Sequence, residues 1–312
     1  MLITFCNLAL LINENKSFMK HITLLISFLV PALFFAQNVE NGEQKADIHK
    51  YKIKSIAIYQ QNYADGKEVG KSFEAANRMY DTTGNITDRV TAFFGSQNIS
   101  WEQYAYDTLG RKIKQSTLDG AAKLKKKIEY QYNASGKILS ETIYDTEGKV
   151  TVTIVYVYDA KGNVLSGTMS GTVKSKMEYT YNKKGKKTAE KMYDDKGKVK
   201  THTTFTYDKK GVLLETSTLD SAGTVTQKNI YTYDNEGRKT QYQTMQGEKE
   251  TYKRTYTYNE AGLVTEYSEY TNGLLSNRCV FSYDKNNMIA SIENYNDKKV
   301  VTGKFNYTYK YY

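Results

Sequence analysis

The sequence contains little proline, cysteine, tryptophan or histidine: one Pro, two Cys, one Trp and three His among 312 residues. A chain that has no proline after Pro31 can run through many hydrogen-bonded strands without losing ladder donors. Cys6 precedes a predicted leader, so Cys279 is the only cysteine expected in the exported chain, which excludes an intramolecular disulfide. Cys279 alternates with Phe281 and Tyr283, so we expect a small buried side chain rather than a reactive thiol.

Signatures of catalysis and of cofactor binding are also scarce. The sequence has no Gly-rich phosphate loop and no H-E-x-x-H motif, and neither His49 nor His202 stands in a nucleophile–base spacing with Cys279. We therefore expect neither an enzyme nor a cofactor. Carboxylates spread along a repeat can still meet in space, so an enzyme stays open as a lesser alternative.

The formal net charge of +10 raises the question of nucleic-acid binding. The lysines are dispersed along the chain, and Lys125–Lys127 is the one tight cluster. A nucleic-acid-binding protein usually concentrates its charge in one stripe or motif. The pattern therefore indicates that the lysines keep the protein surface solvated, and we expect no nucleic-acid partner.

Residues 19–36 have the layout of a secretory signal peptide. Lys20 supplies a basic start, an apolar run follows, and Ala36 or Ala32 offers a small residue for cleavage. The apolar run is too short for a membrane-spanning helix, so we expect no transmembrane helix. Residues 1–18 are interpreted as a mis-assigned start extension. The mature chain is expected outside the cytoplasm, in the periplasm, on the outer surface or secreted.

The remaining chain is dominated by tyrosine, with 29 residues, in a motif that reads aromatic-x-Tyr-Asp/Asn-x-x-Gly. From Tyr80 to Tyr309 the second tyrosine recurs at steps of 23 to 26 residues. Such internal periodicity marks a repeat architecture. We assign residues 37–50 to a linker and residues 51–312 to one repeat domain. A looser turn midway between the motifs, as at Tyr144-Asp145 and Gly148, divides each repeat into two strands.

The turn residues of the motif have a physical explanation. An Asp or Asn side chain accepts a hydrogen bond from the backbone two residues on, and the Gly three residues later adopts a left-handed conformation. Asn287 replaces that Gly once, and Asn is the residue that best tolerates this conformation. One carboxylate per turn argues against calcium ligation, so no metal is expected. The predicted turn pairs are Asp81 and Gly84, Asp107 and Gly110, Asn133 and Gly136, Asp159 and Gly162, Asn182 and Gly185, Asp208 and Gly211, Asp234 and Gly237, Asn259 and Gly262, and Asp284 and Asn287.

Tyrosine and threonine favour strands, and the alternation within the motif places its aromatic residues on one face. We therefore predict an all-β fold, a repetitive antiparallel meander of about 18–20 strands that forms a long curved or spiralling single sheet. Tyrosines of neighbouring hairpins are expected to stack as ladders on that face. The pattern is also compatible with a closed barrel.

The motif resembles the YD repeat of the Rhs (rearrangement hot spot) family, which reads roughly Tyr-x-Tyr-Asp-x-x-Gly-Arg. The match is strongest at Tyr104–Arg111 and Tyr231–Arg238, and it extends over residues 51–312. The resemblance implies a strip of β-sheet that spirals into a hollow shell, which in large members encloses a toxic domain. This chain lacks their proline-rich self-cleavage segment and ends within its last strand at Tyr311-Tyr312, so a stand-alone repeat protein is expected.

These observations favour a non-enzymatic scaffold or binding protein of the bacterial envelope or exterior. Exposed tyrosines on an extended sheet suit a protein or carbohydrate partner. A toxin-associated chaperone or immunity protein is one alternative. An outer-membrane barrel is another, although it would need an apolar band facing lipid, which threonine, lysine and glutamate do not supply.

Overall fold

The computed structural model describes residues 42–93 and 98–312, with one compact unit ending at Asp47 and another running from Ile48 to Tyr312. The elements are α2 (Gly42–Lys50), β1 (Ile53–Ala64), β2 (Lys67–Tyr80), β3 (Ile86–Phe93), β4 (Asn98–Tyr106), β5 (Lys112–Leu118), β6 (Leu124–Tyr132), β7 (Ile138–Tyr144), β8 (Val150–Tyr158), β9 (Val164–Gly171), β10 (Ser175–Tyr181), β11 (Lys187–Tyr193), β12 (Val199–Tyr207), β13 (Leu213–Leu219), β14 (Val225–Tyr233), β15 (Lys239–Gln246), β16 (Lys249–Tyr258), β17 (Val264–Thr271), β18 (Leu274–Tyr283), β19 (Ile289–Tyr295) and β20 (Val301–Tyr311).

The predicted start extension, residues 1–18, and signal peptide, residues 19–36, lie outside the described residues. The described part of the predicted linker, residues 37–50, forms α2 instead of irregular chain. Its sequence contains good helix formers, and His49 and Lys50 in the last turn interact favourably with the helix dipole. Across residues 42–93 and 98–312, no helix combines the length and the hydropathy needed to cross a membrane.

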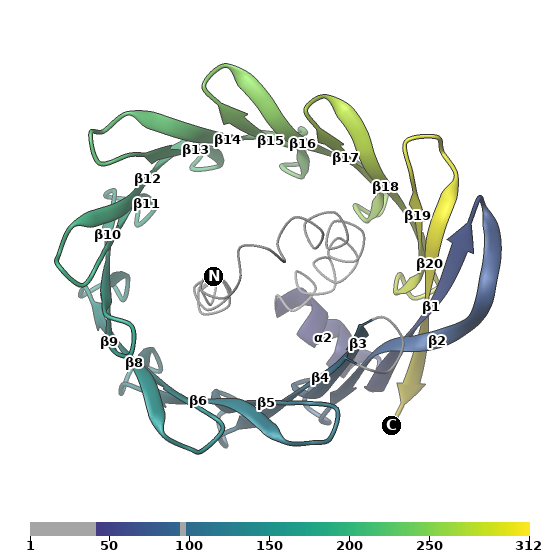
Figure 1. Ribbon diagram of the computed structural model, residues 1–312, viewed down its shortest axis with the longest axis horizontal. Coiled ribbons are helices and arrows are strands. Elements are labelled where there is room, and N and C mark those ends of the chain that lie inside the picture. Colours follow the sequence, from purple (N-terminus) through teal and green to yellow (C-terminus); the bar gives the residue numbers. More distant parts are fainter. Residues whose placement is uncertain (1–41, 94–97) are drawn as a thin grey trace, which may run out of the picture. The chain divides into compact units, whose positions relative to one another are not determined.

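The strands form one antiparallel sheet in which each strand pairs with the next along the chain. The predicted meander is therefore confirmed, with 20 strands. The open, spiralling form is wrong, because β1 pairs with β20 and closes the sheet into a barrel, as the ring of strands in Figure 1 shows. The register of this pairing runs from Ile53 opposite Tyr311 to Asn62 opposite Gly303. Closure has a physical reason, since it removes the two free edges whose backbone groups would otherwise be unpaired.

The two faces of the sheet differ in composition. We call the face that carries both aromatic residues of each motif the tyrosine face, and the opposite face, which carries the residue between them, the threonine face. Buried apolar side chains lie mainly on the tyrosine face, as where Ile128 and Tyr130 of β6 stand beside Ile143 of β7 and Ile154 of β8. The core is thus a layer on one side of a single sheet.

The tyrosines do not form continuous ladders across the strands. Tyr231 lies opposite Tyr242 with ring centroids 5.4 Å apart. Tyr256 lies opposite Tyr267, with ring centroids 6.4 Å apart. In other repeats the first aromatic residue of the motif meets a polar or small residue, as where Tyr130 lies opposite Glu141 and Tyr156 opposite Gly167. The reason is that the odd-numbered strands follow the motif loosely, so aromatic and polar side chains alternate round the barrel.

Candidate functional site

The turn residues are tightly bound to their own backbone. At Asp107 the carboxylate Oδ1 accepts hydrogen bonds from the backbone amides of Leu109 (3.0 Å) and Arg111 (2.9 Å). The hydrogen bond from the Arg111 amide is the first of several that lower the pKa of Asp107 below its usual value. Gly110, with φ of 71°, donates its amide to the Asp107 carbonyl over 2.9 Å.

The same backbone geometry recurs along the chain. The residue three positions on donates its amide to the carbonyl of the Asp or Asn in each predicted pair: Asp81 and Gly84, Asn133 and Gly136, Asp159 and Gly162, Asn182 and Gly185, Asp208 and Gly211, Asp234 and Gly237, Asn259 and Gly262, and Asp284 and Asn287. Asn287 has a φ of 61°, in the left-handed region like the glycines. In the part of the chain that the structure describes, no three or more His, Cys, Asp or Glu side chains are grouped to hold a metal ion.

The second tyrosine of the motif has a role beyond those predicted from the sequence. Its hydroxyl donates a hydrogen bond to the backbone carbonyl at the start of the preceding odd-numbered strand, over 2.6 to 2.9 Å. We call these contacts the tyrosine–carbonyl bonds; they join Tyr106 to Ile86, Tyr132 to Lys112, Tyr158 to Ile138, Tyr181 to Val164, Tyr207 to Lys187, Tyr233 to Leu213, Tyr258 to Lys239, Tyr283 to Val264 and Tyr309 to Ile289.

A signal for these bonds was present in the sequence. The second position of the motif is Tyr in every repeat, whereas the first position accepts Phe205 and Phe281. Of these two aromatic residues only Tyr has a hydroxyl that can donate to a carbonyl, so the difference between the two positions marks the donor. The first position instead supplies an aromatic ring.

Lysines at the start of some odd-numbered strands lie between two of these rings. The Lys112 amine is 5.6 Å from the ring centroid of Tyr104 and 4.9 Å from that of Tyr130, a cation–π geometry. Lys239 lies similarly near Tyr231 and Tyr256. Burial lowers the pKa of both lysines.

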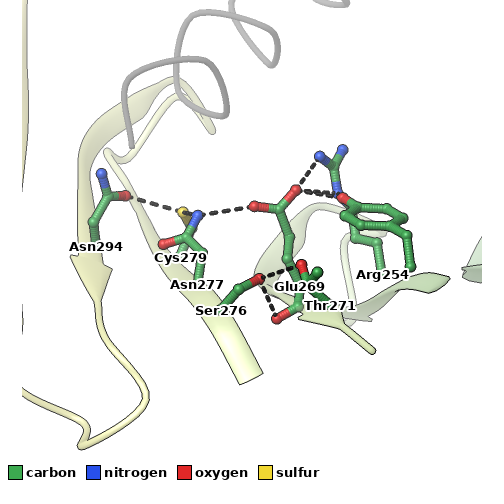
Figure 2. Close-up of polar contacts among 8 residues, drawn as sticks. Arg254, Glu269, Thr271, Ser276, Asn277, Cys279 and Asn294 are labelled. Atoms are coloured by element: carbon green, nitrogen blue, oxygen red, sulfur yellow. Dashed lines mark hydrogen bonds and ion pairs between the residues drawn. The ribbon is translucent and has the colours of Figure 1, made fainter. Parts of the chain in front are cut away.

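A connected polar network occupies the tyrosine face of β16 to β19 (Figure 2). The Arg254 guanidinium forms an ion pair with Glu269, whose Oε2 accepts a hydrogen bond from Asn277 Nδ2 over 3.1 Å. Asn277 also donates to Cys279 Sγ over 3.5 Å, and the thiol donates to Asn294 Oδ1 over 2.9 Å. Each member of this network has its charge or hydrogen-bonding capacity engaged by a neighbour.

The two candidate catalytic side chains lie apart. Cys279 is fully buried on the tyrosine face, and burial raises the pKa of its thiol to about 12. His202 lies on the threonine face, opposite Lys191 and Leu219, and its pKa is lowered, first by burial and then by Lys191. Cys279 and His202 therefore lie on opposite faces of the sheet and in strands that do not pair with each other.

The threonine face carries an exposed apolar cluster at β7, β8 and β9. We call Leu139, Val155, Val157 and Leu165 the β8 patch; they are exposed by 41%, 45%, 51% and 41%. The register places Val155 opposite Ser140 and Val157 opposite Ser166, and Leu139 and Leu165 directly precede these serines at β-bulges. The two residues of such a bulge project to the same side as the residue they oppose. Most other repeats carry Thr at the position of Val157.

Comparison with known proteins identifies the repeat. The family profile described as Teneurin YD-shell matches residues 51–252. No curated protein sequence matches the chain.

Three solved structures show some similarity to this chain, with TM-scores of 0.40 or below. One is TcdB2-TccC3, with 13% identity, a TM-score of 0.40, and coverage of 81% of this chain but 16% of that chain. A version named TcdB2-TccC3-TEV gives 14% identity and the same TM-score, and this chain spans 15% of its length. A porin-like protein from Bacteroides uniformis gives 13% identity and a TM-score of 0.38, with 83% of this chain and 98% of that chain covered.

Proposed function

Because this chain belongs to the Teneurin YD-shell family, we propose that it is an exported, non-enzymatic scaffold that recognises a protein or glycan partner through its sheet. The observation that carries the proposal is the β8 patch. Single exposed apolar side chains also occur elsewhere on this face, as at Ile113 and Leu214, but the β8 patch groups four of them. An exposed group of large apolar side chains is characteristic of an interaction surface. Ser140, Ser166 and Thr168, which the register places beside Val155 and Val157, would form part of its polar rim.

The state of the potential catalytic groups supports a non-enzymatic role. A thiol with a pKa of about 12 is protonated at neutral pH and is therefore a poor nucleophile. The His202 imidazole lies on the other face of the sheet and cannot accept its proton. The turn carboxylates are likewise occupied by backbone amides, as at Asp107.

Affinity purification of the tagged protein from its own cells tests the proposal, with bound proteins and glycans identified by mass spectrometry. The Val155→Thr/Val157→Thr double variant removes the apolar surface and restores the residue type common at this face. Ile230→Thr in β14 is the matched control, because Ile230 occupies the position equivalent to Val155 in another repeat. We expect a stoichiometric partner with the wild type and the control, and its loss with the double variant.

The nature of the recovered partner distinguishes the alternatives. A co-purifying toxin would favour a toxin-associated chaperone or immunity role, whereas recovery of the chain alone would contradict a dedicated partner. Cell fractionation and N-terminal sequencing of the same preparation test export and cleavage near Ala36.

An outer-membrane barrel remains the second candidate architecture for the exported chain. Lys114 and Thr206 on the threonine face are polar where a lipid-facing band needs apolar side chains. Extraction gives the test: a protein that stays in solution without detergent is a scaffold, and one that requires detergent and shows heat-modifiable gel mobility is a membrane barrel.

A further inference from the structure

Two neighbouring turns of the sheet concentrate lysine. The turn of residues 182–186 joins β10 to β11, and the turn of residues 208–212 joins β12 to β13. Because β11 pairs with β12, and alternate turns of a meander lie at the same edge of the sheet, these two turns are neighbours at one edge (Figure 1). We call them the lysine turns. They carry five exposed lysines: Lys183, Lys184, Lys186, Lys209 and Lys210.

Contacts between the lysine turns hold their charges close together. The Lys184 amine donates a hydrogen bond to the backbone carbonyl of Lys209 over 3.3 Å, although the two residues are 25 positions apart in the sequence. The Lys186 stem lies across the second turn, where a Cβ added at Gly211 would meet Lys186 Cε at 3.3 Å. The fold thus gathers lysines that the sequence spreads over two repeats.

The lysine turns contain little opposing charge. Their one carboxylate is that of Asp208, whose Oδ1 accepts a hydrogen bond from the Val212 amide over 2.7 Å. Within the described chain, none of the five lysines forms an ion pair. The next turn along this edge differs, because there Arg238 pairs with Asp234 and Glu236. The lysine turns therefore form a patch of uncompensated positive charge.

The residue types of this patch indicate an extended anionic surface as its partner. Lysine is a flexible point charge, whereas Arg is the usual residue for clasping a single carboxylate or phosphate group. The lysine turns contain no aromatic residue, and aromatic rings are what single-stranded nucleic acids and sugar rings stack on. Clusters of about four to eight basic residues beside a membrane attract its anionic lipids.

Exposed aliphatic side chains border the patch on both sides. Leu214, which is 39% exposed, follows the second turn in β13. Leu165, which is 41% exposed, lies in β9, the strand that pairs with β10. Protein surfaces that rest on a bilayer combine lysines with apolar side chains that enter the headgroup layer. The surroundings of the lysine turns have this combination.

We propose that the lysine turns dock the protein onto a membrane surface rich in anionic phospholipid, as a peripheral contact at one edge of the sheet. The docking surface lies on β10 to β13, and the β8 patch lies on β7 to β9. Apart from Leu165, which borders both surfaces, the two share no residue. Docking therefore goes beyond the proposed partner and does not require it.

Sedimentation of the purified full chain with lipid vesicles tests the docking surface. The wild type is expected to pellet with vesicles of equal parts phosphatidylglycerol and phosphatidylcholine, and to stay in solution with phosphatidylcholine alone. Binding should weaken as the salt concentration rises, because salt screens exposed charges. The variant Lys183→Glu/Lys209→Glu/Lys210→Glu reverses three exposed charges and should lower the apparent affinity for the anionic vesicles by about a hundredfold or more.

The variant Lys196→Glu/Lys198→Glu/Lys200→Glu is the matched control. These exposed lysines lie in or beside the turn between β11 and β12, at the opposite edge of the sheet, where Asp194 and Asp195 accompany them. The control changes the net charge by the same amount, so its binding should stay close to that of the wild type. Circular dichroism checks that both variants keep the β-sheet.

The proposal is overturned if the wild type binds anionic vesicles no better than phosphatidylcholine vesicles, or if the two triple variants bind alike. Binding of the wild type to heparin, a soluble sulfated glycan, without binding to vesicles would also overturn it. The Val155→Thr/Val157→Thr variant should bind anionic vesicles as the wild type does, so loss of the proposed partner and loss of docking are read separately.

Discussion

The hydroxyl of Tyr312 donates a hydrogen bond to the backbone carbonyl of Tyr80, two residues that are 232 positions apart in the sequence. The amide of Tyr312 also donates to the Lys52 carbonyl over 2.9 Å. These contacts lie where the first and last strands of the barrel meet, and they add to the β1–β20 ladder.

Tyr312→Phe should weaken this junction specifically. Loss of one hydrogen bond costs about 0.5–1.5 kcal/mol, so amide exchange should accelerate in β1 and β20 and stay unchanged in β10 and β11. Tyr311→Phe serves as the control, because no hydrogen bond of its hydroxyl is present among the described residues. Equal amide-exchange rates in β1 and β20 of the Tyr312→Phe and Tyr311→Phe variants would contradict a role of the Tyr312 hydroxyl in holding the junction.

The tyrosine–carbonyl bonds predict a cost for removing a single hydroxyl. Tyr207→Phe deletes the 2.7 Å bond to the Lys187 carbonyl and should lower the free energy of unfolding by about 0.5–1.5 kcal/mol. Tyr270→Phe is the control, since Tyr270 contributes its ring to Lys253 and no hydroxyl hydrogen bond within the described chain. Denaturant unfolding measures the free energy of unfolding of the two variants. Equal values would show that the bond from Tyr207 to the Lys187 carbonyl contributes nothing to stability.

At the turn glycines, we expect the stability cost of a substitution to depend on backbone conformation alone. At Gly237, φ is 78° and an added Cβ would meet nothing within 4 Å. Gly237→Ala should therefore destabilise the protein by about 1–2 kcal/mol through left-handed strain. Gly237→Asn should cost less, because Asn287 adopts this conformation in the corresponding turn. Thermal unfolding ranks the two variants, and a fully tolerated alanine would refute the explanation.

The Arg254–Glu269 ion pair should be far more sensitive than an exposed one. Glu269→Ala leaves a largely buried guanidinium without its carboxylate, at a cost of up to about 3–5 kcal/mol, whereas joint replacement of both residues by Met should recover much of that loss. Glu236→Ala breaks the exposed pair with Arg238 and should cost about 0–1 kcal/mol. A double-mutant cycle in denaturant measures these values. Similar costs for the two alanine variants would mean that burial is unimportant here.

Alkaline pH should unfold the barrel through its buried phenols. Burial raises the pKa of Tyr106, Tyr179, Tyr283 and Tyr307 from 10.0 to about 12. The folded state therefore holds these protons more tightly than the unfolded state. This stabilisation is fully present below pH 10 and is lost as the pH rises from 10 to about 12. Phenolate absorbance should increase together with the loss of β-sheet circular dichroism; full ionisation with the sheet intact would contradict this.

Much of the fold could be predicted from the motif. Its spacing determines the strands and turns, and alternation separates Tyr130 and Tyr132 from Gln131. Closure could not be predicted, because β1 precedes the first motif and pairs with β20 through backbone groups that any residue provides. The Arg254 network was missed for a related reason: its members come from four strands and are brought together by register.

The pairing order has a consequence for how the protein reaches its native state. Each strand pairs with the one made just before it, so hairpins can form one after another as the chain emerges, with fast local contacts. The β1–β20 pairing must wait for the last strand, and it joins ends that the finished hairpins already bring near one another. Until then β1 and the most recently formed strand remain open edges, and open edges are the sites at which neighbouring chains add strands. Assembly of the barrel therefore carries its aggregation risk at these two edges and for a limited time.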